Sequence, residues 1–152
     1  NYEGQELVVF NSQSVDDTYY LARKFAQNIS KGNVIALIGN LGTGKTTFTK
    51  GLAKALGILE NVGSPTFKLV SEYVGTDSVL YHIDAYRLEG SKDFLNIGGE
   101  EYLTAEDGIT VIEWADIIGD ILDDDVIQVK FARIQNNSES RQIEIRGIKF
   151  DF

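Results

Sequence analysis

The residues best suited to chemistry form one glycine-rich run. Residues 39–46 read Gly-Asn-Leu-Gly-Thr-Gly-Lys-Thr and satisfy the P-loop pattern G-x-x-x-x-G-K-[ST] at every position. In such a loop, backbone N–H groups surround a phosphate, the lysine brings positive charge to the β- and γ-phosphate oxygens, and the last hydroxyl ligates Mg²⁺. The run predicts a site for a nucleoside triphosphate with Mg²⁺, formed by Gly39, Asn40, Leu41, Gly42, Thr43, Gly44, Lys45, Thr46 and Thr47.

The segments on either side of this run have the order that a P-loop requires. Residues 34–38 are wholly apolar, which is typical of a parallel strand buried on both faces. Residues 46–56 carry apolar side chains at helical spacing, and Gly57 supplies a stop signal. A chance glycine-rich turn lacks this context, so we interpret the run as a P-loop.

The rest of the chain predicts a single P-loop ATPase domain over residues 1–152. Ser14 is expected to cap a helix that ends near residue 29, and the segment 89–108 is expected to hold short helical stretches broken at 98–99. We expect further strands at 7–10, 67–74, 79–84, 109–113, 126–131 and 142–148, and a short helix at 115–122. Turn residues at 75–78 and 135–140 predict two antiparallel hairpins. The predicted fold class is α/β: a three-layer P-loop NTPase fold whose mixed, mainly parallel central sheet has antiparallel additions.

Composition narrows the possible functions. The chain has 14 Lys and Arg against 23 Asp and Glu, a net charge of −9, so it should bind nucleic acid poorly by itself and contact RNA only indirectly. It has no cysteine, which excludes disulfides and thiolate metal sites, and it shows no signal peptide or membrane span. We expect a cytoplasmic protein with no membrane contact.

Phosphate chemistry at a P-loop also needs a carboxylate near the phosphates. Two apolar strands end in one, Asp84 after residues 79–83 and Glu113 after residues 109–112. Because ligands of open α/β sheets bind at the carboxyl ends of strands, either could hold Mg²⁺ or polarise the attacking water. Each could equally cap the segment that follows it. Lys45, Asp84 and Glu113 are therefore the candidate catalytic residues, and Thr46, Asp84 and Glu113 the candidate metal ligands.

Four other residues are weaker candidates. Thr66 follows the P-loop helix, where GTPase-type proteins keep a segment that senses the γ-phosphate, although a rigid turn before a strand explains it equally well. His82, the only histidine, is interpreted as a packed strand residue with one hydrogen-bonded nitrogen. Arg87 is expected to pair with Asp84 rather than with a phosphate. Trp114, the only tryptophan, is expected in the core.

Five linked motifs carry a family resemblance. They are G-N-L-G-T-G-K-T-T-F, S-P-T-F, H-I-D-A-Y-R-L, G-G-E-E-Y-L and V-I-E-W-A-D. In this order, on a chain this short, they resemble the bacterial TsaE family, also called YjeE, over roughly residues 14–116. Gly99 is one departure, because a larger apolar residue is expected there from the family pattern.

The resemblance implies a small ATPase, with ATP and Mg²⁺, that is required for making threonylcarbamoyladenosine (t6A) in tRNA. It implies TsaD and TsaB as partners, whose repeated turnover ATP hydrolysis would support. It also implies phosphate and Mg²⁺ roles for Lys45 and Thr46, and it makes Glu113 the Mg²⁺-site glutamate and Asp84 the other acidic site residue. The segment around Ser14 and Thr18 would border the adenine.

The sequence leaves alternatives open for the nucleotide and for the class of activity. The chain has no [NT]-K-x-D motif for guanine, so ATP is favoured over GTP. A small-molecule kinase would need a lid with arginines, whereas residues 89–108 are acidic and contain none. A binding module that is gated by ATP and hydrolyses it slowly is a further alternative.

Overall fold

The computed structural model describes residues 7–40, 42–63, 69–76, 78–135 and 139–148. Within these residues, seven strands form one sheet in the order β1-β7-β6-β2-β5-β4-β3. The strands are β1 (Leu7–Ser12), β2 (Val34–Ile38), β3 (Val70–Val74), β4 (Val79–Asp84), β5 (Gly108–Glu113), β6 (Ile127–Arg133) and β7 (Arg141–Arg146). The four central strands β6, β2, β5 and β4 pair in parallel, and β3, β7 and β1 add antiparallel pairs at the two sides. The predicted mixed α/β sheet and both antiparallel hairpins are confirmed.

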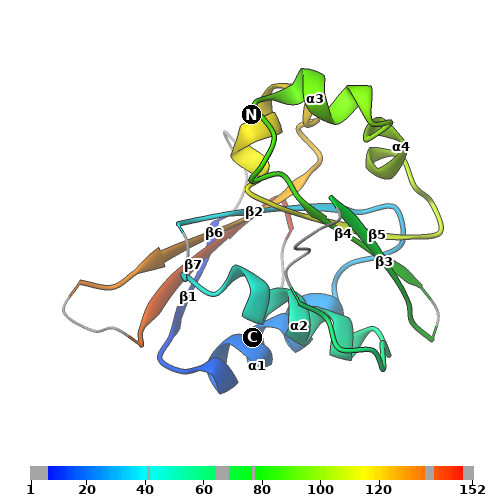
Figure 1. Ribbon diagram of the computed structural model, residues 1–152. Coiled ribbons are helices and arrows are strands. Elements are labelled where there is room, and N and C mark those ends of the chain that lie inside the picture. Colours follow the sequence, from blue (N-terminus) through cyan, green and yellow to red (C-terminus); the bar gives the residue numbers. More distant parts are fainter. Residues whose placement is uncertain (1–6, 41, 64–68, 77, 136–138, 149–152) are drawn as a thin grey trace.

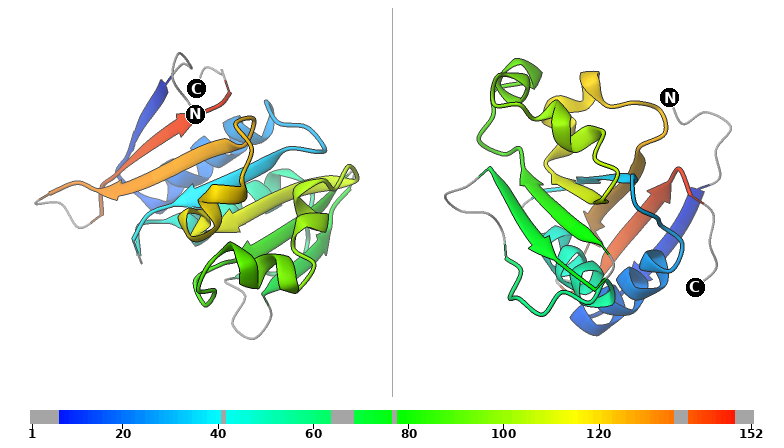
Figure 2. Two further views of the ribbon diagram at one scale, coloured as in Figure 1. Left: turned by 90° about the horizontal axis from the view of Figure 1, so that it is seen from above. Right: turned by 90° about the vertical axis from the view of Figure 1, so that its right-hand side faces the viewer.

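Helices cover the sheet on both faces (Figure 1). Helices α1 (Val15–Ala26) and α2 (Lys45–Ala55) lie on one face. Helices α3 (Ser91–Asn96) and α4 (Glu100–Leu103), together with the 3₁₀ helix η1 (Ala115–Ile121), lie on the other. The views in Figure 2 show the same three layers from above and from the side. None of the helices in the described ranges is long and apolar enough to cross a bilayer.

The central strand β2 has its side chains in two separate hydrophobic cores. Ile35 and Leu37, both fully buried, pack in the core that includes Phe48 of α2. Val34 and Ala36 alternate with them and face the core on the side of α3 and η1. Truncating a fully buried phenylalanine such as Phe48 typically costs about 3–5 kcal/mol of stability. This packing fixes the strand and the helix between which the P-loop lies.

A local sequence signal explains where helix α1 begins. Ser14 caps α1 as predicted, because its Oγ accepts a hydrogen bond from the Asp17 N–H at 3.1 Å. The Asp17 carboxylate in turn accepts a hydrogen bond at 2.9 Å from the N–H of Gln13, one residue before the cap. The helix ends at Ala26 rather than near residue 29, since the chain turns at Gln27.

The connection between α3 and α4 breaks at residues 98–99, as predicted. A Cβ atom on Gly99 would lie 2.6 Å from atoms of the Phe94 ring, so a larger residue does not fit there without moving that ring. The fully buried Phe94 therefore accounts for the glycine.

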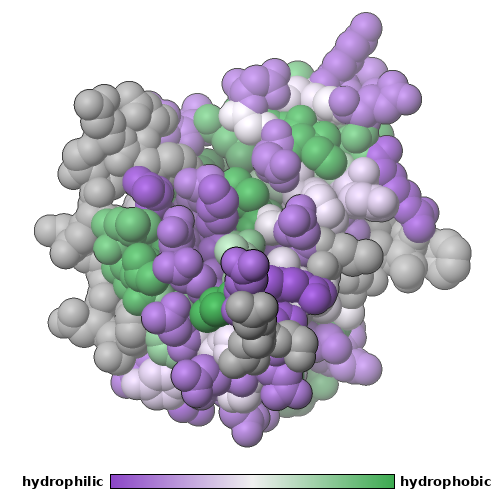
Figure 3. Space-filling model, turned by 90° about the vertical axis from the view of Figure 1, so that its left-hand side faces the viewer, coloured by the Kyte–Doolittle hydropathy of each residue, from purple (hydrophilic) through white to green (hydrophobic). Residues whose placement is uncertain are grey.

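Seen from the left-hand side of Figure 1, the surface is mainly hydrophilic with separate apolar patches, as is usual for a folded domain (Figure 3).

Candidate nucleotide-binding site

The P-loop lies between the end of β2 and the start of α2. Gly42 and Gly44 have φ angles of +77° and +105°, a left-handed region that strains other residues. Gly39 approaches β6 so closely that a Cβ atom would lie 2.8 Å from the Phe131 carbonyl oxygen. The helix begins at Lys45, so the N–H groups of its first turn adjoin the loop, where they favour an anion.

A cleft of about 420 Å³ opens beside this loop, a volume within the usual range for small-molecule sites. The predicted residues that line it are Ser14, Thr18, Gly42, Gly44, Lys45, Thr46, Thr47, Asp84 and Glu113. Gly39, Asn40 and Thr43 line a neighbouring hollow behind the loop. Leu41 and Thr66 fall outside the described residues. The structure brings the predicted residues that it describes to one place, and their binding roles stay predictions.

Lys45 is held within the loop. Its side chain is buried, and Nζ donates hydrogen bonds to the carbonyl oxygens of Gly39 and, at 3.4 Å, Asn40. Nζ also lies 3.7 Å from the centre of the Trp114 ring, a cation–π contact. Burial lowers the pKa of Lys45 from its ordinary value, while the carboxylates of Glu113, Asp116 and Asp84 oppose this effect. A bound phosphate would replace these contacts of Lys45 with a contact to a full negative charge.

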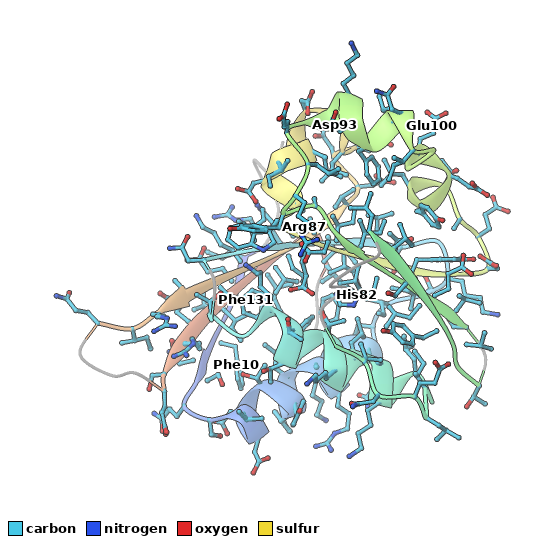
Figure 4. The ribbon with its side chains drawn as sticks, in the orientation of Figure 1. Phe10, His82, Arg87, Asp93, Glu100 and Phe131 are labelled. Atoms are coloured by element: carbon cyan, nitrogen blue, oxygen red, sulfur yellow. The ribbon has the colours of Figure 1, made fainter. Side chains whose placement is uncertain are left out.

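Glu113 is almost fully buried, and both of its carboxylate oxygens accept hydrogen bonds. The Thr46 hydroxyl donates to Oε1 at 3.2 Å. His82 Nε2 lies 2.5 Å from Oε2 and carries the hydrogen, because a carboxylate can only accept. His82 is a packed strand residue with one bonded nitrogen, as predicted, but its partner is the predicted site carboxylate, which the sequence did not reveal. The side chain lies inside the molecule, as Figure 4 shows.

Asp84 lies beside Glu113, since the parallel register of β4 and β5 pairs these two residues. Its Oδ1 accepts a hydrogen bond from the Tyr86 N–H at 3.0 Å, and no donor among the described residues contacts Oδ2. Burial raises the pKa of Asp84, the Tyr86 N–H lowers it, and the nearby Glu113 raises it further.

The predicted ion pair of Asp84 with Arg87 is wrong within the described residues. Arg87 is exposed at the cleft and makes no such pair.

The core position expected for Trp114 is confirmed in part. The residue is half-buried and packs against the core on the side of α3 and η1, but it also lines the cleft. Its backbone has a φ angle of +58°, which is rare for a residue other than glycine. The indole ring contacts Lys45 on one side, and its centre lies 4.9 Å from that of the Tyr86 ring. Backbone strain of this kind concentrates at functional sites. No sequence pattern indicated it.

The end of β1 and the start of α1 form one polar wall of the cleft. The hydroxyls of Thr18 and Ser12 are hydrogen bonded to each other at 2.7 Å, and both residues line the cleft. Ser14 also lines it, although its Oγ already caps α1. This wall and the carboxylates of Asp84 and Glu113 line the same cleft, so the arrangement can hold a ligand with two chemically different ends.

Two arginines near the loop were missed by the sequence reasoning. Arg133 and Arg141 face each other across β6 and β7, and each donates a hydrogen bond to the Gly42 carbonyl oxygen, at 3.3 and 3.1 Å. A Cβ atom on Gly42 would lie 2.5 Å from Arg133 Nη2, so the end of that flexible side chain would have to shift. Like charges directly opposite on a ladder repel each other. Their shared acceptor on the P-loop links this hairpin to the site.

The donor set fits Mg²⁺ held jointly with a nucleotide. Within the described ranges, no group of three or more His, Cys, Asp and Glu side chains could hold a metal ion by itself. Mg²⁺ seldom needs one, since it usually takes one or two protein ligands together with phosphate oxygens and water. The hydroxyl oxygen of Thr46, which donates to Glu113 and lines the same cleft as Asp84, would be such a ligand.

Comparison with known proteins gives one consistent result. Residues 12–143 match the family model described as "Threonylcarbamoyl adenosine biosynthesis protein TsaE". The relative named tRNA threonylcarbamoyladenosine biosynthesis protein TsaE from Bacillus subtilis is 39% identical over 133 residues, which cover 88% of this chain and 81% of that protein. The protein of the same name from Treponema pallidum is 43% identical over 105 residues, or 69% and 76% of the two chains. The crystal structure of Bacillus subtilis YdiB superposes with a TM-score of 0.80 at 30% identity, covering 95% of this chain and 88% of that one.

Replacing Asp84 by asparagine should stabilise the protein at neutral pH without nucleotide or Mg²⁺. Folding raises the pKa of Asp84, so the charged carboxylate opposes folding above that pKa, and the effect vanishes below the ordinary value of 3.8, where both states are protonated. We expect Asp84→Asn to raise the Tm by up to a few degrees at neutral pH. The difference should disappear as the pH falls below 3.8. Calorimetry beside the exposed-loop control Glu60→Gln checks this, and a lower Tm of Asp84→Asn at neutral pH would contradict it.

Trp114 should report nucleotide binding. Lys45 must leave the indole face to reach a phosphate, and Trp114 is the only tryptophan, so its emission should change saturably as ATP is added. Lys45→Ala should abolish most of the change, whereas Lys50→Ala, an exposed position on the same helix, should retain it. Unaltered emission under conditions where calorimetry shows ATP bound would refute the prediction.

Proposed function

This chain belongs to the TsaE family, and we propose that it binds and hydrolyses ATP with Mg²⁺ to support the formation of t6A in tRNA. The observation that carries the proposal is the hydrogen bond from Thr46 to Glu113, formed at the first turn of the P-loop helix and beside Asp84. It joins the predicted metal-binding hydroxyl of the P-loop to a strand-end carboxylate, which is the arrangement that P-loop NTPases use.

The P-loop residues would bind the triphosphate. Backbone N–H groups of the loop and of the start of α2 would surround the phosphates, and Lys45 Nζ would move from the Gly39 carbonyl to the phosphate oxygens. Bound Mg²⁺ would neutralise negative charge on the β- and γ-phosphate oxygens. Thr46 can coordinate the metal through a lone pair of its oxygen while its hydroxyl hydrogen is still donated to Glu113, because these are different parts of one hydroxyl.

The two carboxylates then take different roles. Glu113 has both oxygens engaged, by Thr46 and by His82, so it acts as the acceptor that fixes the metal ligand. Asp84 keeps Oδ2 without a donor from the described residues and faces the cleft. We assign to Asp84 the orientation of the attacking water. The raised pKa of Asp84 makes it a better proton acceptor than an ordinary aspartate.

The other end of the nucleotide would lie against the start of α1. Ser12, Ser14 and Thr18 line the cleft there, and we place the adenosine beside them. Arg87, exposed at the cleft and unpaired among the described residues, would be available to a phosphate. The proposed sensing of the γ-phosphate by Thr66 stays a sequence-based prediction.

The relatives' names support the biological setting. We propose that this chain acts in the cytoplasm with TsaD and TsaB homologues, which handle the tRNA. The net charge of −9 supports this division, because a strongly acidic protein repels the tRNA backbone. Two arginine contacts to the Gly42 carbonyl would couple the β6–β7 hairpin to the nucleotide state of the P-loop.

A multiple-turnover assay tests the proposed function. With purified TsaD–TsaB, substrate tRNA, threonylcarbamoyl-adenylate and ATP, we expect this protein to raise the t6A yield beyond one product per heterodimer. Lys45→Ala should remove that increase, because it removes the phosphate-binding charge, and Lys50→Ala should preserve it. Equal yields with wild type and Lys45→Ala would contradict the proposal. An increase that occurs while ATP stays intact would favour the nucleotide-gated binding module instead.

A further inference from the structure

The structure assigns a role to the buried histidine next to the site. We propose that His82 is a positioning residue that holds Glu113, and through it Thr46, in the geometry needed for Mg²⁺. This inference rests on the ATPase function proposed above. The sequence around His82 indicates only a packed strand, and this inference assigns the side chain a function in the site.

The contact is direct and shielded from water. His82 is fully buried, Glu113 is 3% exposed, and Nε2 lies 2.5 Å from Oε2. His82 precedes Asp84 by two residues on β4, so both side chains lie on the same face of the sheet. The neighbouring strand β5 ends in Glu113. His82 therefore contacts the Glu113 carboxylate from β4, and Thr46 contacts it from the first turn of the P-loop helix.

The two hydrogen bonds constrain the carboxylate at both oxygens. Oε2 accepts from His82 and Oε1 accepts from Thr46, so the first bond fixes the plane in which the second forms. Without the imidazole, Oε2 would be a buried acceptor with no donor, and Glu113 would have to rotate or admit water. Either change would move the acceptor that orients the Thr46 hydroxyl. Partners that orient metal-site groups in this way strongly affect metal binding and activity.

Packing alone does not account for a histidine at this position. Its Nδ1 is buried and has no hydrogen-bond partner among the described residues. A buried polar atom without a partner costs free energy, whereas an apolar side chain of similar size would avoid that cost. What the imidazole provides in return is the single N–H directed at Glu113.

Three variants separate positioning from packing. His82→Met keeps a similar volume and removes the donor, and His82→Gln places an amide N–H at similar reach. Leu80→Val perturbs a fully buried position on the same face of β4, away from Glu113. The measurements are kcat, KM for ATP, the Mg²⁺ concentration for half-maximal rate, and the Tm of each variant.

We expect His82→Met to lower kcat or Mg²⁺ affinity by roughly 10–100-fold, with a much smaller change in KM for ATP. His82→Gln should recover most of that loss. Leu80→Val should lower the Tm and leave kcat unchanged. In a Glu113→Gln background, His82→Met should cause little further loss, since the histidine acts through that residue. Wild-type kcat in His82→Met, no recovery in His82→Gln, or a full additional loss in the Glu113→Gln background would each overturn the proposal.

A spectroscopic measurement keeps the inference separate from the ATPase proposal. His82 is the only histidine, so ¹⁵N-labelled imidazole gives one pair of ring signals. We expect a hydrogen-bonded Nε2–H whose shift changes in Glu113→Gln and not in Leu80→Val. If the wild-type protein hydrolysed no ATP, the proposed function would fail by itself. An unchanged imidazole spectrum in Glu113→Gln would then still refute the pairing of His82 with Glu113.

Discussion

The parallel register of β2, β5 and β4 is the constraint on which the site depends. It pairs Leu37 with Glu113 and Glu113 with Asp84, so these three residues lie at one level of the sheet. The P-loop begins two residues after Leu37, and the first turn of α2 therefore meets the strand-end carboxylates. A change of register by one residue would turn Glu113 to the opposite face and remove it from Thr46.

This arrangement places two carboxylates side by side, which is unfavourable unless positive charge or donors lie nearby. Lys45 supplies the charge, and it is itself buried against Trp114 and the P-loop carbonyls. Thr46 and His82 supply the donors to Glu113. Asp84 is left with the least compensation, and burial, together with the neighbouring Glu113, raises its pKa. The site thus has an incompletely balanced charge that Mg²⁺ would neutralise.

Much of the fold was readable because its signals are local. The apolar run at 34–38, the glycines of the loop and the cap at Ser14 each act within a few residues, and the structure has the expected strand, loop and helix there. The strand-end positions of Asp84 and Glu113 follow from the same kind of pattern. Rules about where ligands bind in parallel sheets were then enough to bring these residues together.

The parts that sequence reasoning missed depend on contacts between distant segments. His82 and Glu113 are 31 positions apart, and the pairing of Arg141 with the Gly42 carbonyl spans 99. No spacing rule connects such residues. The left-handed backbone of Trp114 likewise follows from how β5 ends, rather than from residue type. The same holds for Arg87, which follows β4 and forms no ion pair within the described residues.

The most direct test of this account is a crystal structure with Mg²⁺ and a nonhydrolysable ATP analogue. We expect the metal to be bound by the Thr46 hydroxyl oxygen while Thr46 still donates to Glu113, with Lys45 on the phosphates and the adenosine beside Ser14 and Thr18. A nucleotide bound elsewhere, or a Thr46 hydroxyl turned away from both the metal and Glu113, would contradict it.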